Sequence, residues 1–279
     1  KASKGKVKVH IFDVPLQYHT DLAEAVAEVF HKPPLDSWQS IKEEGLRKLA
    51  RQVPTASKLC TREGWDTSAY HSTHMAGIIA SQANSSGFIG LSPTSRISAY
   101  DISQYDLIPP PSHFFSNLED YKTDGSKHVV LIANNLSIST STEDSTPPEN
   151  LNPLTRAFKD NDVLIVAAIA QNESGSERLL LHQHLRKIPS TLGLLDNVVT
   201  VTGCTKCTSN SEAELLPGTY IAKEDHLIHL AAPADQIPGL SSLVSYTATD
   251  GNSQAAAYVT GVAALMMSLF PDCYSSPHA

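Results

Sequence analysis

The chain has 279 residues, a length that suits one large domain or two small ones. Hydrophobic residues make up 41% of it, an ordinary share that excludes a disordered tail, a collagen-like rod and a disulfide-dense miniprotein. The formal net charge of -8 argues against a protein that binds nucleic acid or an anionic membrane surface, because such proteins need a basic field.

Short apolar runs rich in β-branched residues alternate with helix candidates along the chain. In chain order we expect a strand over residues 7–13, helices over 21–31, 37–51 and 71–81, strands over 96–102 and 128–139, a helix over 151–160, strands over 163–170, 197–203 and 227–231, and a last helix over 253–270. Several of these strands are apolar on both faces, which is typical of parallel strands covered by helices. The alternation predicts one α/β domain with a mostly parallel sheet.

Residues 27–61 are more charged than their surroundings and contain a dense run of acidic and basic side chains within 42–51. A charge run of this kind usually marks a solvated face. We therefore interpret the segment as a charged helical insertion on the outside of the single domain, with a partner-docking arm as the alternative. No run reaches the ~18 apolar residues that a membrane span requires.

Three local patterns place chemically useful side chains at the ends of expected elements. A strand ends at Asp13, a helix opens at His71, and the last helix begins at Ser253. Carboxylates at strand ends in α/β folds commonly face the ligand crevice. An acid, a histidine and a serine can form a relay of orienting group, base and nucleophile. Taken singly, the serine is explained as a helix N-cap and the aspartate as a turn or cap residue.

Taken together, these patterns resemble the subtilisin-like serine proteases, the subtilases. Residues 71–77 read His-Ser-Thr-His-Met-Ala-Gly against the family's His-Gly-Thr-His-Val-Ala-Gly, and residues 251–261 match its serine motif in the same chain order. Four further blocks, at 19–22, 84–93, 163–173 and 230–233, match in sequence order. The resemblance runs from about residue 7 to residue 271, and it implies a three-layer α/β fold with a mostly parallel central sheet flanked by helices.

The resemblance also implies a role for each matched residue. Ser253 would be the nucleophile, His71 its general base, and Asp13 the group that orients the imidazole. Asn172 would donate its side-chain amide to the oxyanion together with the backbone N–H of Ser253. The expected function is a serine endopeptidase that works through an acyl-enzyme and needs no cofactor for its chemistry. A degenerate peptide-binding module and a subtilase that transfers the acyl group to an amine stay open as alternatives.

The sequence departs from the family pattern at several positions beside these residues. Asn252 replaces the Thr before the serine, Ser72 replaces the Gly after the histidine, and Ala257 replaces a Pro. Gln171 replaces the Gly before the oxyanion asparagine. None of these changes removes a proton-transfer group.

The same resemblance predicts the walls of a substrate pocket, the one that holds the side chain of the substrate residue before the scissile bond. They are Ser137, Ile138 and Ser139 on one side and Ile169, Ala170 and Gln171 on the other. A polar Gln171 is expected to narrow this pocket or to give it a hydrogen-bonding floor, which favours a narrow specificity. The alternative is that Gln171 points to solvent.

In many subtilases an acid and an asparagine at the positions of Asp21 and Asn84 bind a structural calcium ion. These two residues are therefore candidate calcium ligands here, with capping of the following helix by Asp21 as the alternative. Cys204 and Cys207 have the spacing of half a zinc site but lack a second pair, so we expect either free thiols or a local disulfide. The expected partners are a protein or peptide substrate and a pro-segment or inhibitor, and the resemblance suggests secretion.

Overall fold

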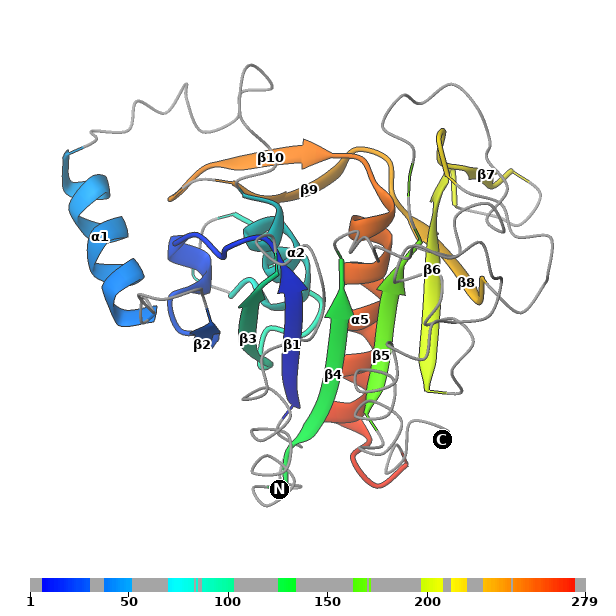
Figure 1. Ribbon diagram of the computed structural model, residues 1–279, viewed down its shortest axis with the longest axis horizontal. Coiled ribbons are helices and arrows are strands. Elements are labelled where there is room, and N and C mark those ends of the chain that lie inside the picture. The colour runs from blue at the N-terminus through cyan, green and yellow to red at the C-terminus, as the bar shows by residue number, and fades with distance from the viewer. Residues whose placement is uncertain are drawn as a thin grey trace, which may run out of the picture.

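The computed structural model describes residues 7–30, 38–51, 70–82, 84, 87–102, 125–133, 163–169, 171, 197–207, 212–219, 228–241 and 243–273. Within these residues an eight-stranded sheet forms the centre of the molecule, in the order β2-β3-β1-β4-β5-β6-β7, and β8 also pairs with β6 (Figure 1). The strands are β1 (Val7–Asp13), β2 (Val26–Phe30), β3 (Arg96–Asp101), β4 (Lys127–Ile132), β5 (Leu164–Ala168), β6 (Val198–Thr205), β7 (Glu214–Leu215) and β8 (Leu230–Pro233). All described pairs in this sheet are parallel except β6 with β7.

The central strand β1 is buried on both faces. Val9 and Ile11 are fully buried and belong to the main hydrophobic core. Phe12 points to the opposite face, where its ring stacks on Tyr100 of β3 with centroids 4.6 Å apart. Burial on both sides explains why the strand reads as a nearly continuous apolar run, as strands of parallel sheets do.

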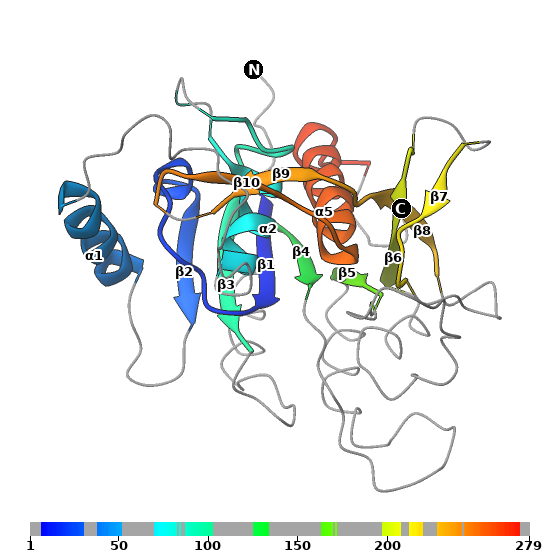
Figure 2. The ribbon, with the colours of Figure 1, turned by 90° about the horizontal axis from the view of Figure 1, so that it is seen from above.

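Two helices, α2 (His71–Ala80) and α5 (Asn252–Leu269), contact each other and pack on the same face of the sheet (Figure 2). Beside α2 lies an antiparallel hairpin of β9 (Ile237–Leu240) and β10 (Tyr246–Thr249). The helix and the hairpin approach closely because Gly77 has no side chain; a Cβ there would lie 2.5 Å from Cγ of Leu240. Gly77 thus brings α2 close to the β9–β10 hairpin.

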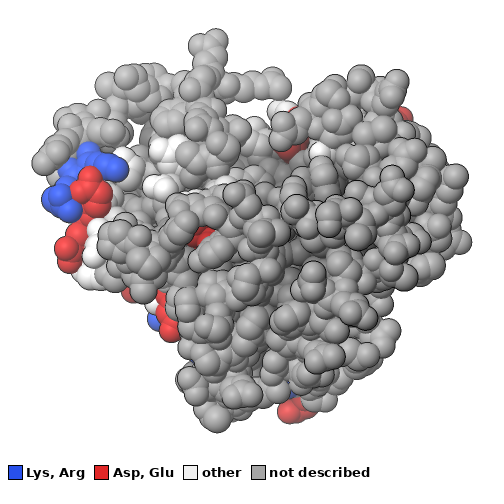
Figure 3. All heavy atoms as spheres, viewed as in Figure 1, with Lys and Arg blue, Asp and Glu red and all other residues white. Residues whose placement is uncertain are grey.

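The helix α1 (Trp38–Arg51) lies beside the edge strand β2. Its charged side chains gather on the same edge of the molecule in the space-filling view (Figure 3). Glu44 forms ion pairs with Arg47 at 2.8 Å and with Lys48 at 3.7 Å, and all three side chains are well exposed. These three charged side chains of the helix therefore lie on a solvated face. The insertion over 27–61 stays a prediction, although its first residues, 27–30, belong to β2.

The expected helix over 21–31 is wrong. A short 3-10 helix, η1 (Thr20–Leu22), is followed by the strand β2, which pairs with β3. The free edge of β3 accepts this segment, and pairing along that edge outweighs the local helical pattern. The last expected strand is shifted, since β8 begins at Leu230.

The remaining elements agree with expectation to within a few residues, except where they lie outside the described part. The expected helix over 151–160 and the end of the strand expected over 128–139 fall outside it. Cys204 and Cys207 are joined by a disulfide, the second of the two states that the sequence left open. None of the helices that the structure describes combines the length and the apolar character needed to cross a bilayer.

Candidate active site

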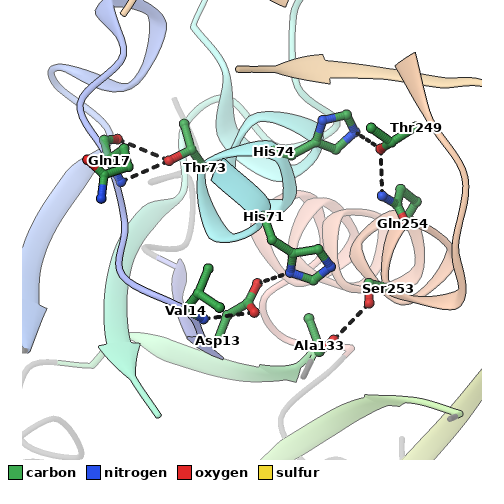
Figure 4. A network of polar contacts seen from close by, with 10 residues as sticks. All are labelled: Asp13, Val14, Gln17, His71, Thr73, His74, Ala133, Thr249, Ser253 and Gln254. Carbon is green, nitrogen blue, oxygen red and sulfur yellow. Dashed lines mark hydrogen bonds and ion pairs between the residues drawn. The ribbon is translucent and has the colours of Figure 1, made fainter. Parts of the chain in front are cut away.

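Asp13 and His71 form the best-defined polar contact of the site. Asp13 is the last residue of the central strand β1, and His71 is the first residue of α2. Oδ2 of Asp13 accepts a hydrogen bond from Nδ1 of His71 at 2.5 Å, and Oδ1 accepts one from the backbone N–H of Val14 at 2.8 Å (Figure 4). The carboxylate is fully buried, and each of its oxygens accepts a hydrogen bond from one of these two donors.

A second pair of hydrogen bonds holds α2 in place over the end of β1. Oγ1 of Thr73 accepts from the backbone N–H of Gln17 at 2.9 Å and donates to the Gln17 carbonyl at 3.1 Å (Figure 4). The first turn of α2 is thus tied to the segment that follows β1, and this tie fixes His71 over Asp13.

The charge of Asp13 sets the protonation of His71. Burial by itself lowers the pKa of the imidazole, but the negative charge of Asp13 and the hydrogen bond to it outweigh burial, so that the net effect is a raised pKa. A raised pKa makes the imidazole a better proton acceptor. The bond at Nδ1 also leaves Nε2 as the nitrogen that can accept a proton.

Ser253 is the second residue of α5 and lies next to the histidine. In Figure 4 the second ring nitrogen of His71 is on the side that faces Ser253. The hydroxyl of Ser253 donates to the carbonyl oxygen of Ala133 at 2.7 Å, so its proton must be redirected before His71 can take it. The tertiary structure thus brings together Asp13, His71 and Ser253. The Ala133 contact gave no signal in the sequence, because a backbone carbonyl has no residue signature.

The start of α5 also offers a hydrogen-bond donor beside the serine. Within the described part of the chain, the backbone N–H of Ser253 has no acceptor. The helix cap at Gly251 supplies no side-chain hydrogen bond. A helix N-terminus with a free N–H favours negative charge, and this donor is therefore suited to an oxyanion. Asn172, the second expected donor, lies outside the described residues.

His74 belongs to a bridge between the two helices and does not compete with His71. Its Nε2 lies 3.2 Å from Oγ1 of Thr249, which also accepts from Nε2 of Gln254 at 2.7 Å (Figure 4). Burial and, after it, the neighbouring His71 lower the pKa of His74 to about 4. The ring is therefore neutral near pH 7. The described residues hold no group of three His, Cys, Asp or Glu that could bind a metal.

Two of the expected pocket residues are described well enough to be placed. Ile169 is buried directly after β5. Gln171 is hydrogen-bonded at both ends of its amide: Nε2 donates to the carbonyl of Pro217 at 3.2 Å, and Oε1 accepts from the backbone N–H of Asn252 at 3.3 Å. Its amide therefore contacts protein at both ends. The other expected wall residues, Ser137, Ile138, Ser139 and Ala170, lie outside the described residues.

Asp21 and Asn84, the expected calcium ligands, do lie together. Nδ2 of Asn84 donates to Oδ1 of Asp21 at 2.7 Å, and the hydroxyl of Tyr246 donates to Oδ2 at 2.9 Å. Both carboxylate oxygens thus accept hydrogen bonds from protein donors, an arrangement that satisfies Asp21 without a cation. The expected helix-capping role of Asp21 is not seen either, because the strand β2 follows η1, and η1 itself, which contains Asp21, is capped by His19.

Solved structures with the same fold are similar to this chain at low identity. The prenylagaramide maturation protease PagA is 18% identical with a TM-score of 0.60, and the match covers 99% of this chain and 81% of that one. The S41 psychrophilic protease is 18% identical with a TM-score of 0.65, and the match covers 97% of this chain and 79% of that one. The A-subunit of the AB5 toxin from E. coli is 18% identical with a TM-score of 0.64, and the match covers 98% of this chain and 80% of that one. No curated protein matches the chain in sequence.

These likenesses establish the fold, a mostly parallel sheet with flanking helices. A family model adds the identity, because the model described as the Subtilase family matches residues 5–279. The chain therefore belongs to the subtilase family of serine proteases.

Proposed function

We propose that this protein is a serine endopeptidase in which Asp13, His71 and Ser253 form the catalytic triad. The observation that carries the proposal is the 2.5 Å contact between Asp13 and His71, with Ser253 at the start of α5 next to it. Family membership supports a peptidase that acts on proteins or peptides. The triad geometry supports the finer statement that the reaction passes through an acyl-enzyme.

In the proposed mechanism, Ser253 attacks the carbonyl carbon of the scissile peptide bond while Nε2 of His71 takes the hydroxyl proton. Asp13 stays ionised and stabilises the imidazolium that forms. The N–H of Ser253 and the side chain of Asn172 hold the negative oxygen of the tetrahedral intermediate. His71 then gives its proton to the leaving amine. Water, activated by His71, attacks the acyl-enzyme and releases the acid.

We also propose that the protein is secreted and that a pro-segment or inhibitor binds at the same site as the substrate. The Cys204–Cys207 disulfide supports an oxidising compartment, because cytosolic proteins usually keep such thiols reduced. The pro-segment rests on the family resemblance alone.

The first test is labelling by a fluorophosphonate, which reacts only with an activated serine. We expect one adduct, on Ser253, and no adduct in the Ser253→Ala variant, whose peptidase kcat should fall by about 10⁶-fold. Ser268→Ala, a change on the same helix far from the site, is the matched control and should label normally. A folded wild-type protein without an adduct would show that the chain is a degenerate peptide-binding module.

The second test follows from the raised pKa of His71. A general base works only when it is neutral, so kcat/KM should fall as the pH drops through that raised pKa, and the acid limb should lie above the ordinary histidine value of 6.5. Asp13→Asn removes the charge that raises the pKa. We expect this variant to shift the limb to lower pH and to lose about 10⁴-fold in kcat. An unchanged limb would contradict the assigned pairing.

The third test concerns the specificity that we assign to Gln171. Cleavage of a peptide library should reveal a narrow preference at the residue before the scissile bond. Gln171→Gly, which restores the usual family residue, should broaden that preference because the wall loses a fixed polar group. Uniform cleavage after large apolar residues by the wild-type protein would show that Gln171 does not restrict the pocket.

The fourth test addresses the loop around Asp21, where we propose a hydrogen-bonded latch of Asp21, Asn84 and Tyr246 in place of a calcium site. A cation that does not bind cannot stabilise the fold, so Tm should agree within about 1 °C between millimolar calcium and a chelator. Tyr246→Phe should lower Tm in both buffers, because it removes a donor from a buried carboxylate. A calcium-dependent rise in the wild-type Tm of about 5 °C would contradict the latch.

A further inference from the structure

The side chain of Asn252, the residue before Ser253, is bonded to three separate segments. Nδ2 donates to the carbonyl of Ile169 at 2.9 Å. Oδ1 accepts from the backbone N–H of Gly203 at 2.7 Å and from Oγ1 of Thr219 at 3.1 Å. Only 2% of the residue is exposed. Its amide is therefore hydrogen-bonded at both ends in a nearly fully buried position.

Two of the three partners of the Asn252 side chain lie toward the carboxyl ends of neighbouring strands. Ile169 directly follows β5, and Gly203 lies in the second half of β6. The two strands are bonded to each other at this point, since β5 and β6 pair in parallel and the Ile169 N–H donates to the Val201 carbonyl at 2.9 Å. A residue anchored to both strands cannot shift without breaking buried hydrogen bonds.

The fit between Asn252 and β6 depends on the absence of a side chain at Gly203. A Cβ at that position would lie 2.7 Å from Oδ1 of Asn252 and 2.5 Å from Cβ of Ala234. The glycine thus allows the asparagine to reach the strand backbone. The threonine usual at position 252 in the family has a shorter side chain with a single polar atom, whereas the amide of Asn252 carries its donor and its acceptor on two separate atoms that reach different strands.

The backbone of Asn252 is held as well. Its N–H donates to Oε1 of Gln171 at 3.3 Å, so the first N–H of α5 is occupied while that of Ser253 has no acceptor among the described residues. Both amide groups are neutral. They fix the helix start without adding a negative charge beside the place where the oxyanion forms.

We propose that Asn252 is a positioning residue that fixes the hydroxyl and the N–H of Ser253 relative to the sheet edge, an inference that rests on the proposed function. The hydroxyl and the N–H belong to the next residue in the chain, so a displaced Asn252 moves both. Misplacement of reacting groups by about 1 Å costs on the order of 100-fold in rate.

The test compares Asn252→Ala with Asn197→Ala. Asn197 is a buried asparagine between the same two strands at their opposite ends, where Nδ2 donates to the Val163 carbonyl at 2.9 Å. For Asn252→Ala we expect kcat and the rate of fluorophosphonate labelling to fall by about 10- to 100-fold, with KM changed less than about threefold. Asn197→Ala should lower Tm and leave kcat unchanged.

A second variant keeps the proposal testable where Asn252→Ala does not fold. Thr219→Val removes one donor to Oδ1 and should lower kcat by about threefold to tenfold with little change in KM. If both site variants lose Tm but keep wild-type kcat, Asn252 has a structural role only and the proposal fails. If the wild-type protein itself takes up no fluorophosphonate, the proposed function fails instead.

Discussion

The fully buried carboxylate of Asp13 is the constraint on which the rest of the site depends. A buried charge is costly unless it is paired and hydrogen-bonded. Asp13 meets this requirement with the Val14 N–H and the His71 ring, which lies 58 positions further along the chain. The start of α2 therefore has to lie over the end of β1. The small residues of α2 and the Thr73–Gln17 hydrogen bonds allow and hold that placement.

The second helix is placed by a different kind of interaction. α5 contacts β4, β5 and β6 through its small residues, and its first turn is anchored by polar contacts to the ends of β5 and β6. Ser253 thus reaches His71 from the far end of the chain because one parallel sheet carries both helices. Backbone groups at strand ends also contribute to the site, namely the carbonyls of Ala133 and Ile169 and the N–H of Gly203.

Expectations from the sequence held where local pattern and burial agree. The strand at 7–13 and the helices beginning at His71 and near Ser253 were expected and are present. The helix expected over 21–31 is absent because pairing with the edge of β3 overrides a short helical pattern. The Asp21–Asn84 proximity also follows from the motif resemblance. The hydrogen bond to Asp21 from the Tyr246 hydroxyl, 225 positions further along the chain, does not follow from that resemblance.

By itself, the sequence predicted the family and the alternating α/β elements, and it marked Asp13, His71 and Ser253 as the candidate triad, because these depend on motifs and on periodicity along the chain. It also marked Asn252 and Gln171 as unusual without explaining them. Only the tertiary structure decided that Gln171 bonds the backbone of Asn252 and that the Asn252 side chain joins β5, β6 and Thr219. Such contacts join segments up to 83 positions apart, and a hydrogen bond to a backbone group leaves no trace in the partner's residue type.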